Sequence, residues 1–219
     1  MQGIENHHRY LAGGDTNGLT RPGTYSLPLV IRCHLHFGTI HYRKSCRWIR
    51  MTFFSTTPVL TKGIPMQTSD FTDISYQLDS DGIVTVSMNT PKRKNAISGL
   101  TALELRWAAK HFQNDDNAQA MILTGAPDPD SAPERQAFSS GGYFVPGIYD
   151  DLPADILAQI DQTDIAMKAT VLEFFGCDKP VLAAINGLAI GGGITLPLAV
   201  ADQIYCSEHA WARLPFASL

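Results

Sequence analysis

The sequence predicts an α/β fold, and three observations after residue 70 carry this prediction. Short runs of aliphatic and β-branched residues alternate with longer segments whose apolar residues recur at helical spacing. Two of the strand-like runs lie next to glycine-rich loops, at residues 138–142 and 186–193. The predicted order is hairpin, helix, strand, helix, strand, helix and strand, an alternation that is typical of α/β proteins.

The hairpin and the first helix have clear local signals. Residues 75–78 and 83–88 flank a turn-forming Asp-Ser-Asp-Gly segment, and residues 83–88 alternate apolar with polar side chains. This alternation indicates a strand with one buried face. Ser98 is the expected N-cap of a helix over about residues 100–112, and residues 120–124 follow as a short buried strand.

The later elements are predicted in the same way. Residues 154–175 indicate one helix or two short ones, and residues 180–185 and 203–206 indicate strands. The last helix is expected from about Ile194, with Pro197 in its first turn, where proline is tolerated. The apolar residues expected to face inward from the segment 154–175 are Ile156, Ile160, Ile165, Met167 and Leu172.

The distribution of charge divides the chain. Residues 1–69 contain eight Lys and Arg against two acidic residues, and nothing between Asp15 and Asp70 is acidic. We therefore predict a basic leader without ordered structure at residues 1–65 and a folded domain at residues 66–219. The leader fits an organelle transit peptide and, equally well, an extension absent from the mature protein, because Met66 precedes what resembles a natural N-terminus.

Several classes of function are disfavoured. The composition, 44% hydrophobic with 9% aromatic residues, is that of a globular chain, and no apolar run is long enough to cross a bilayer. The basic leader lacks the interleaved aromatic residues of a nucleic-acid-binding segment. Its metal-capable side chains do not follow the spacing of a zinc site, so no metal centre is predicted. These side chains are Cys33, His34, His36, His41 and Cys46.

The two glycine-rich loops form the main candidate site. Glycine permits close approach of the backbone to a ligand, and the start of a helix presents unpaired N–H groups with a partial positive charge. Two such donors directed at one carbonyl oxygen stabilise the negative charge of an enolate or a tetrahedral intermediate. The loops therefore predict an enzyme.

Four segments, in this order, carry a resemblance to a known family: residues 94–97, 137–142, 179–193 and 202–206. With them, the region from about Ile74 onward resembles the enoyl-CoA hydratase/isomerase (crotonase) superfamily. The resemblance implies a spiral of β-β-α units, incomplete at the C-terminus in this chain, that binds acyl-CoA thioesters and assembles as trimers. No cofactor is implied, since coenzyme A is part of the substrate. The implied compartment is the mitochondrial or peroxisomal matrix, with the cytosol as the alternative.

The resemblance also implies roles for individual residues. The N–H groups of Ser140 and Gly192 are expected to form the oxyanion hole around the thioester oxygen. Lys94 and Ala96 are expected along the CoA moiety, with the cationic side chains of the segment 92–94 near its phosphates, and Leu188 is expected to line the acyl pocket. The further substrate-binding positions are Gly141, Gly142 and Gly191.

The proton-transferring glutamates of the hydratases are missing from the matching positions. Thr195 and Phe216 occupy these positions, and neither side chain is a general base near neutral pH. Hydration is therefore disfavoured. The segment 210–219 is more similar to the Δ3,Δ2-enoyl-CoA isomerase branch, in which a single glutamate further along the chain moves the proton. We expect a double-bond shift through a stabilised enolate, in fatty acid β-oxidation.

Other interpretations stay open. One is a catalytically silent acyl-CoA-binding homologue or a truncated gene product that lacks the general base. If a carboxylate of the chain does act as base, the candidates are Asp150, Asp151 and Asp155, which fit equally the charged start of a helix. A dinucleotide-binding loop, a P-loop and a serine hydrolase with Ser139 or Ser140 as nucleophile each fail the spacing of their motif.

Overall fold

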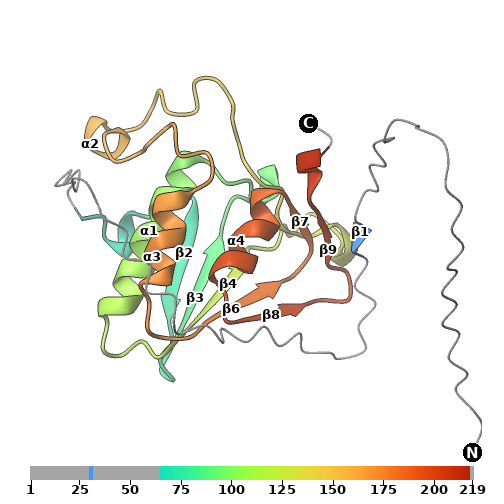
Figure 1. Ribbon diagram of the computed structural model, residues 1–219, viewed down its shortest axis with the longest axis horizontal. Coiled ribbons are helices and arrows are strands. Elements are labelled where there is room, and N and C mark those ends of the chain that lie inside the picture. The colour runs from blue at the N-terminus through green and yellow to red at the C-terminus, as the bar shows by residue number, and fades with distance from the viewer. Residues whose placement is uncertain (1–29, 32–64, 218–219) are drawn as a thin grey trace, which may run out of the picture.

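The computed structural model of the protein describes residues 30–31 and 65–217. Within these residues, two β-sheets and a layer of helices form the fold (Figure 1). The predicted leader lies outside the described residues except for Val30–Ile31 and residue 65, so its interpretation stays a prediction. The cysteine and histidine group considered for zinc also lies outside them.

The larger sheet has five strands in the order β2-β3-β4-β6-β8. The antiparallel pair of β2 and β3 is the predicted hairpin, and the other neighbours in this sheet pair in parallel. Its strands are β2 (Ile74–Leu78), β3 (Ile83–Met88), β4 (Ala120–Gly125), β6 (Val181–Ile185) and β8 (Gln203–Cys206). Every second residue of β3 is fully buried, as the alternation in the sequence predicted.

The smaller sheet has four strands in the order β1-β9-β7-β5. These strands are β1 (Val30–Ile31), β9 (Trp211–Arg213), β7 (Leu188–Ile190) and β5 (Ala137–Ser139). Along the chain β5 follows β4, β7 follows β6 and β9 follows β8. In each pair of consecutive strands, the first belongs to the larger sheet and the second to the smaller sheet. A helical segment follows each pair. This repetition confirms the predicted spiral of β-β-α units.

Helices α1 and α3 pack against each other in front of the larger sheet, and α4 lies beside α3 (Figure 1). Their bounds are α1 (Gly99–Asn114), α3 (Lys168–Phe175) and α4 (Gly192–Val200), and α2 (Ala154–Leu157) is a single turn between β5 and α3. Helix α1 begins as predicted, because the Ser98 hydroxyl accepts a hydrogen bond from the N–H of Thr101 at 3.1 Å.

Sequence patterns missed three strands, and two expectations from the sequence were wrong. The strands β5, β7 and β9, of three residues each, were not predicted, since so short a segment carries no periodicity. Ile165 and Leu172 are 69% and 56% exposed, because the chain before Lys168 turns instead of continuing a helix and so changes the register. Helix α4 begins two residues earlier than predicted, which places Pro197 beyond the first turn.

Candidate functional site

The loop after β5 directs one main-chain N–H group away from the body of the protein. Gly141 has φ +93°, a conformation that favours glycine, and its carbonyl accepts a hydrogen bond from the N–H of Ile97 at 2.7 Å. The N–H of Tyr143 donates to the carbonyl of the same Ile97 at 2.8 Å. In a trans peptide group the C=O and the N–H point in opposite directions. Because the Gly141 carbonyl points toward Ile97, the N–H of Gly142 in the same peptide group points away from Ile97.

The second glycine-rich loop places another N–H group at the start of α4. Gly191, with φ +53°, precedes the helix and donates its own N–H to the carbonyl of Arg213 at 2.9 Å. Gly192 is the first residue of the helix, where N–H groups have no partner in the helix and the local potential is positive. None of the described residues accepts a hydrogen bond from Gly192 N–H.

These two donor residues lie close together. A Cβ atom built on Gly192 would lie 3.9 Å from the nitrogen of Gly142, and one built on Gly141 would lie 3.5 Å from the nitrogen of Gly192. Gly142 is exposed and Gly192 half-buried, so a ligand can reach both. The N–H of Gly142 also lacks an acceptor among the described residues. The site therefore offers two neighbouring main-chain donors without acceptors among the described residues, which is what binding of a carbonyl oxygen with partial negative charge requires.

Ser140 is placed differently from the expectation. Its N–H donates to the carbonyl oxygen of Lys94 at 2.9 Å, and its hydroxyl donates to the carbonyl of Arg93 at 3.3 Å. Lys94 and Asn95 both have positive φ, and the tight turn that they form brings the Lys94 carbonyl against β5. The expected pairing of the Ser140 and Gly192 donors is thus not formed in this structure. Nothing in the sequence signals which peptide plane faces the site, since hydrogen bonds to distant segments set it.

The lysines expected near the CoA phosphates contact the loop 126–136. The ammonium group of Lys92 forms ion pairs with Asp128, at 3.2 Å, and with Asp130. Hydrogen bonds to Asp130 and Asp128 raise the pKa of Lys92, and the main-chain N–H of Asp130 contributes most to lowering the pKa of Asp128. Lys94 Nζ donates to the carbonyl of Arg135 at 3.2 Å. Both ammonium groups therefore have partners in this loop.

Two other expected site residues lie in the framework of the site. Ala96 is 4% exposed, and its N–H donates to the carbonyl of Arg93 at 3.2 Å. Leu188 is half-buried in β7, opposite Trp211 of β9, and its N–H donates to the carbonyl of Gln136 at 3.0 Å. Their roles toward a substrate stay predictions.

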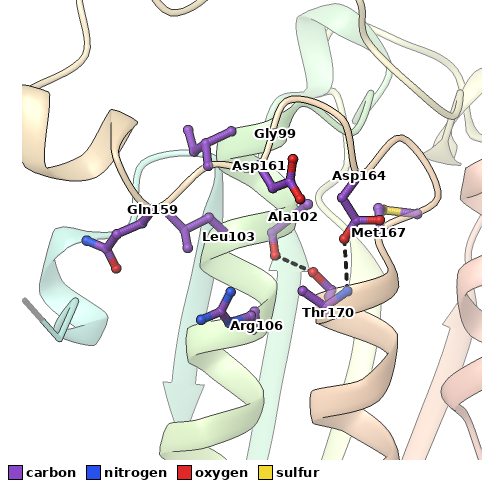
Figure 2. Close-up of a pocket in the computed structure, with 11 residues that line it drawn as sticks. Gly99, Ala102, Leu103, Arg106, Gln159, Asp161, Asp164, Met167 and Thr170 are labelled. Carbon is purple, nitrogen blue, oxygen red and sulfur yellow. Dashed lines mark hydrogen bonds between the residues drawn. The ribbon is translucent and has the colours of Figure 1, made fainter. Parts of the chain in front are cut away.

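Met167 is a residue of the site that the sequence did not single out. Its Cε atom would lie 3.5 Å from a Cβ atom on Gly192. It also lines a cavity of about 50 Å³ between α1 and the segment leading into α3, which Figure 2 shows. In that cavity wall the hydroxyl of Thr170 donates to the carbonyl of Ala102 at 2.8 Å and joins the two helices. Met167 thus separates the cavity from the donor pair.

The described residues place no carboxylate in contact with Gly192. Within 4 Å of a Cβ atom on Gly192, the described residues other than its own helix and neighbours contribute only Met167 and Gly142. Asp150, Asp151 and Asp155 are exposed on the segment that follows the first loop, with Asp155 in the first turn of α2. Thr195 is half-buried, and its N–H donates to the carbonyl of Gly191 at 3.0 Å.

Across residues 65–217, His, Cys, Asp and Glu side chains form no group of three or more that could hold a metal ion. None of the helices in the same part of the chain is long and apolar enough to span a bilayer.

The protein is thus defined by a spiral of β-β-α units whose two glycine-rich loops meet at the start of α4. A model of the enoyl-CoA hydratase/isomerase family matches residues 79–219, and the chain belongs to this family. It is 34% identical over 148 residues to carnitinyl-CoA dehydratases of Escherichia coli K12 and Shigella flexneri, and the match covers 66% of this chain and 50% of each relative.

Solved structures agree with this assignment. An enoyl-CoA hydratase/isomerase from Mycobacterium paratuberculosis superposes with a TM-score of 0.52 at 27% identity, covering 71% of this chain and 55% of that one. An enoyl-CoA hydratase from Bacillus anthracis superposes with a TM-score of 0.52 at 26% identity, covering 67% and 52%. The chain therefore spans about half the length of the relatives it matches.

Proposed function

We propose that this chain binds an acyl-CoA thioester and holds its carbonyl oxygen between the N–H groups of Gly142 and Gly192. Gly142 takes the role that the sequence had indicated for Ser140, whose N–H is bonded to Lys94. The observation that carries the proposal is a pair of main-chain donors that have no acceptor among the described residues and lie close together, with a Cβ atom built on Gly192 only 3.9 Å from the nitrogen of Gly142. Removal of one donor from such a site typically lowers kcat about 10²- to 10³-fold.

The surroundings of the donors support a thioester as ligand. The relatives named above are enzymes of CoA thioesters by their names. Lys92 and Lys94 are residues of the type that binds phosphate groups, and the Lys94 carbonyl accepts the N–H of Ser140 in the first glycine-rich loop. A small cavity of about 50 Å³ lies on the other side of Met167, which closes it off from the donors.

The reaction that we propose for the whole protein is a double-bond shift in an enoyl-CoA, as in fatty acid β-oxidation. Withdrawal of a proton next to the carbonyl places negative charge on the thioester oxygen, where Gly142 and Gly192 stabilise it. A general base then returns the proton to another carbon. Thr195, at the position of a hydratase glutamate, supports this one-base reaction over hydration.

A second candidate function is binding of acyl-CoA without turnover. It is favoured by one observation: among the described residues outside α4 and the neighbours of Gly192, no carboxylate lies within 4 Å of a Cβ atom built on Gly192. Assembly as a trimer and a location in the mitochondrial or peroxisomal matrix remain part of the proposal for the whole protein.

The variant Gly192→Ala tests the site. Its methyl group would lie 3.9 Å from the nitrogen of Gly142, within the space that the thioester oxygen would occupy, and would meet only the flexible end of Met167. We expect about a 100-fold loss of affinity for butyryl-CoA or of kcat/KM with 3-hexenoyl-CoA, with the melting temperature retained. Ser140→Ala is the matched control, since it keeps every main-chain donor.

The outcomes separate the two functions. Isomerisation of 3-hexenoyl-CoA by the wild type, lost in Gly192→Ala, supports the enzyme. Tight binding of butyryl-CoA without any isomerisation supports the silent binding protein. Equal binding of butyryl-CoA by Gly192→Ala and the wild type would contradict the donor site itself.

A further inference from the structure

Arg93 lies between a carboxylate and an aromatic ring at the edge of the donor loop. Its guanidinium group forms an ion pair with Asp73 at 2.6 Å, and its Cζ atom lies 4.9 Å from the centroid of the Tyr143 ring. The ion pair is largely shielded from solvent, with side-chain exposures of 27% for Arg93 and 13% for Asp73. The planar guanidinium can therefore donate to the carboxylate while its face attracts the π-electrons of the ring.

Tyr143 directly follows the donor residue Gly142. The peptide groups on both sides of Gly142 are bonded to Ile97, one through the Gly141 carbonyl and the other through the Tyr143 N–H. Rotation of these peptide planes would break both bonds and would swing the Tyr143 side chain off Arg93. The position of the Tyr143 ring is therefore coupled to the direction of the Gly142 N–H.

We propose that Arg93 is a positioning residue. The ion pair with Asp73 holds Arg93 in place, and Arg93 in turn fixes the Tyr143 ring and so keeps the Gly142 N–H directed toward Gly192. The inference rests on the proposed function, because it assigns a role to the same pair of donors. It extends the site to a residue that does not itself contact the thioester oxygen.

The structure allows this role to be separated from a role in folding. Asp73 also accepts hydrogen bonds from the hydroxyls of Ser98 at 2.9 Å and Thr101 at 2.6 Å, so its connection to α1 does not depend on Arg93. In addition, Arg93 Nε is buried without a hydrogen-bond partner among the described residues, so an apolar replacement removes an unsatisfied donor. We expect Arg93→Met to fold with little change in melting temperature.

The experiment compares binding of butyryl-CoA with binding of free CoA by calorimetry, using the full chain, four variants of Arg93 and Tyr143, and Gly192→Ala as the reference for a lost donor site. Free CoA lacks the acyl group, so the ratio of the two affinities reports on the contacts of the acyl group, its thioester carbonyl included, and not on the contacts of the CoA moiety. The preference for butyryl-CoA over free CoA is expected to fall about tenfold in Arg93→Met and in Tyr143→Ala. This factor corresponds to the free energy of one well-directed hydrogen bond. Tyr143→Phe should retain the preference, because it keeps the ring face, and Arg93→Lys should lose part of it.

Isotope-edited infrared spectra of bound ¹³C-labelled butyryl-CoA provide a second readout. Two directed donors lower the carbonyl stretching frequency, and we expect this shift to shrink in Arg93→Met and to remain in Tyr143→Phe. A role limited to stability would leave the spectrum of the bound thioester unchanged.

Each outcome decides the proposal. An equal loss of affinity for free CoA and butyryl-CoA in Arg93→Met would identify Arg93 as a phosphate contact and overturn it. An unchanged preference in both Arg93→Met and Tyr143→Ala, with the preference lost in Gly192→Ala, would overturn the positioning role while the donor site stands. Absence of any preference in the wild type would instead reject the proposed function.

Discussion

A Cβ atom built on Gly193 would lie 2.4 Å from the main-chain carbonyl oxygen of Ser139. The start of α4 therefore touches β5 backbone to backbone, and this contact holds the two glycine-rich loops together. A side chain at position 193 cannot be accommodated by a rotamer change, because the opposing atom belongs to the main chain.

The first prediction concerns this contact. Gly193→Ala is expected to lower the free energy of unfolding by about 1–3 kcal/mol, the usual cost of overpacking, and to move the donors apart. Urea denaturation measures the stability. Gly192→Ala is the control, since its methyl group makes an ordinary 3.5 Å contact with Met167 and alanine favours a helix. Similar losses in both variants would show that the backbone contact is not the cause.

The elements that local sequence determines could be predicted. The N-cap at Ser98 and the alternation in residues 83–88 each depend on neighbours within a few positions. The mistake over Ile165 has a different origin. The helical register there depends on where α3 starts, and the side chain of Asp164, which accepts the N–H groups of Lys168 and Ala169, sets that start.

The candidate site was predicted at the level of its loops and not of its atoms. Both glycine-rich loops converge as expected, because their glycines allow close approach. The choice of Gly142 over Ser140 depends on which carbonyl each N–H meets, and the Lys94 and Ile97 carbonyls come from a segment more than 40 positions earlier. A pattern of residue types contains no information on such peptide orientations.

The second prediction concerns Glu104, which is fully buried. Its carboxylate accepts the N–H groups of Thr72, Asp73 and Ile74, at 2.8 to 2.9 Å, and ties β2 to α1. Gln at this position turns an amide donor toward those donors, so Glu104→Gln is expected to cost about 1–3 kcal/mol. Chemical denaturation at neutral pH measures this difference.

The pH dependence of the Glu104 contribution has a definite sign. Burial raises the pKa of this carboxyl above its usual range, against the opposing effect of the main-chain hydrogen bonds. The folded state therefore binds this proton more tightly than the unfolded state. Its contribution is greatest below the ordinary carboxyl pKa and falls as the pH rises toward the raised value. The stability difference between wild type and Glu104→Gln, measured across this window, should change in that direction; the opposite slope would contradict the assignment.

The third prediction concerns Tyr76, whose hydroxyl is buried without a hydrogen-bond partner among the described residues. Burial, and to a lesser extent the charge of Asp115, raises its pKa to about 12. Tyr76→Phe removes an unsatisfied polar group and is expected to stabilise the fold by about 1 kcal/mol. In the wild type, stability should fall as the pH rises from 10 toward 12, since the phenol ionises in the unfolded state first. A stability loss in Tyr76→Phe at neutral pH would reveal a partner for this hydroxyl.

The fourth prediction concerns Met167, which stands between the donor pair and the cavity of Figure 2. Met167→Ala opens this passage, so an acyl chain whose carbonyl is held by Gly142 and Gly192 can extend into the cavity. Each methylene group that becomes buried there contributes about 0.8 kcal/mol. Calorimetric titration should therefore show a gain in affinity for hexanoyl-CoA relative to acetyl-CoA.

Met167→Leu is the matched control for this prediction, since it keeps the volume of the side chain and should keep the preference of the wild type. The backbone of Met167 has φ +55°. Alanine and leucine both have a Cβ atom, so each variant has the same backbone strain at this position as the wild type. A difference between the alanine and leucine variants consequently reports on space alone. If the affinities for hexanoyl-CoA and acetyl-CoA change equally in Met167→Ala, the acyl chain lies elsewhere, and the cavity between α1 and α3 has no part in substrate binding.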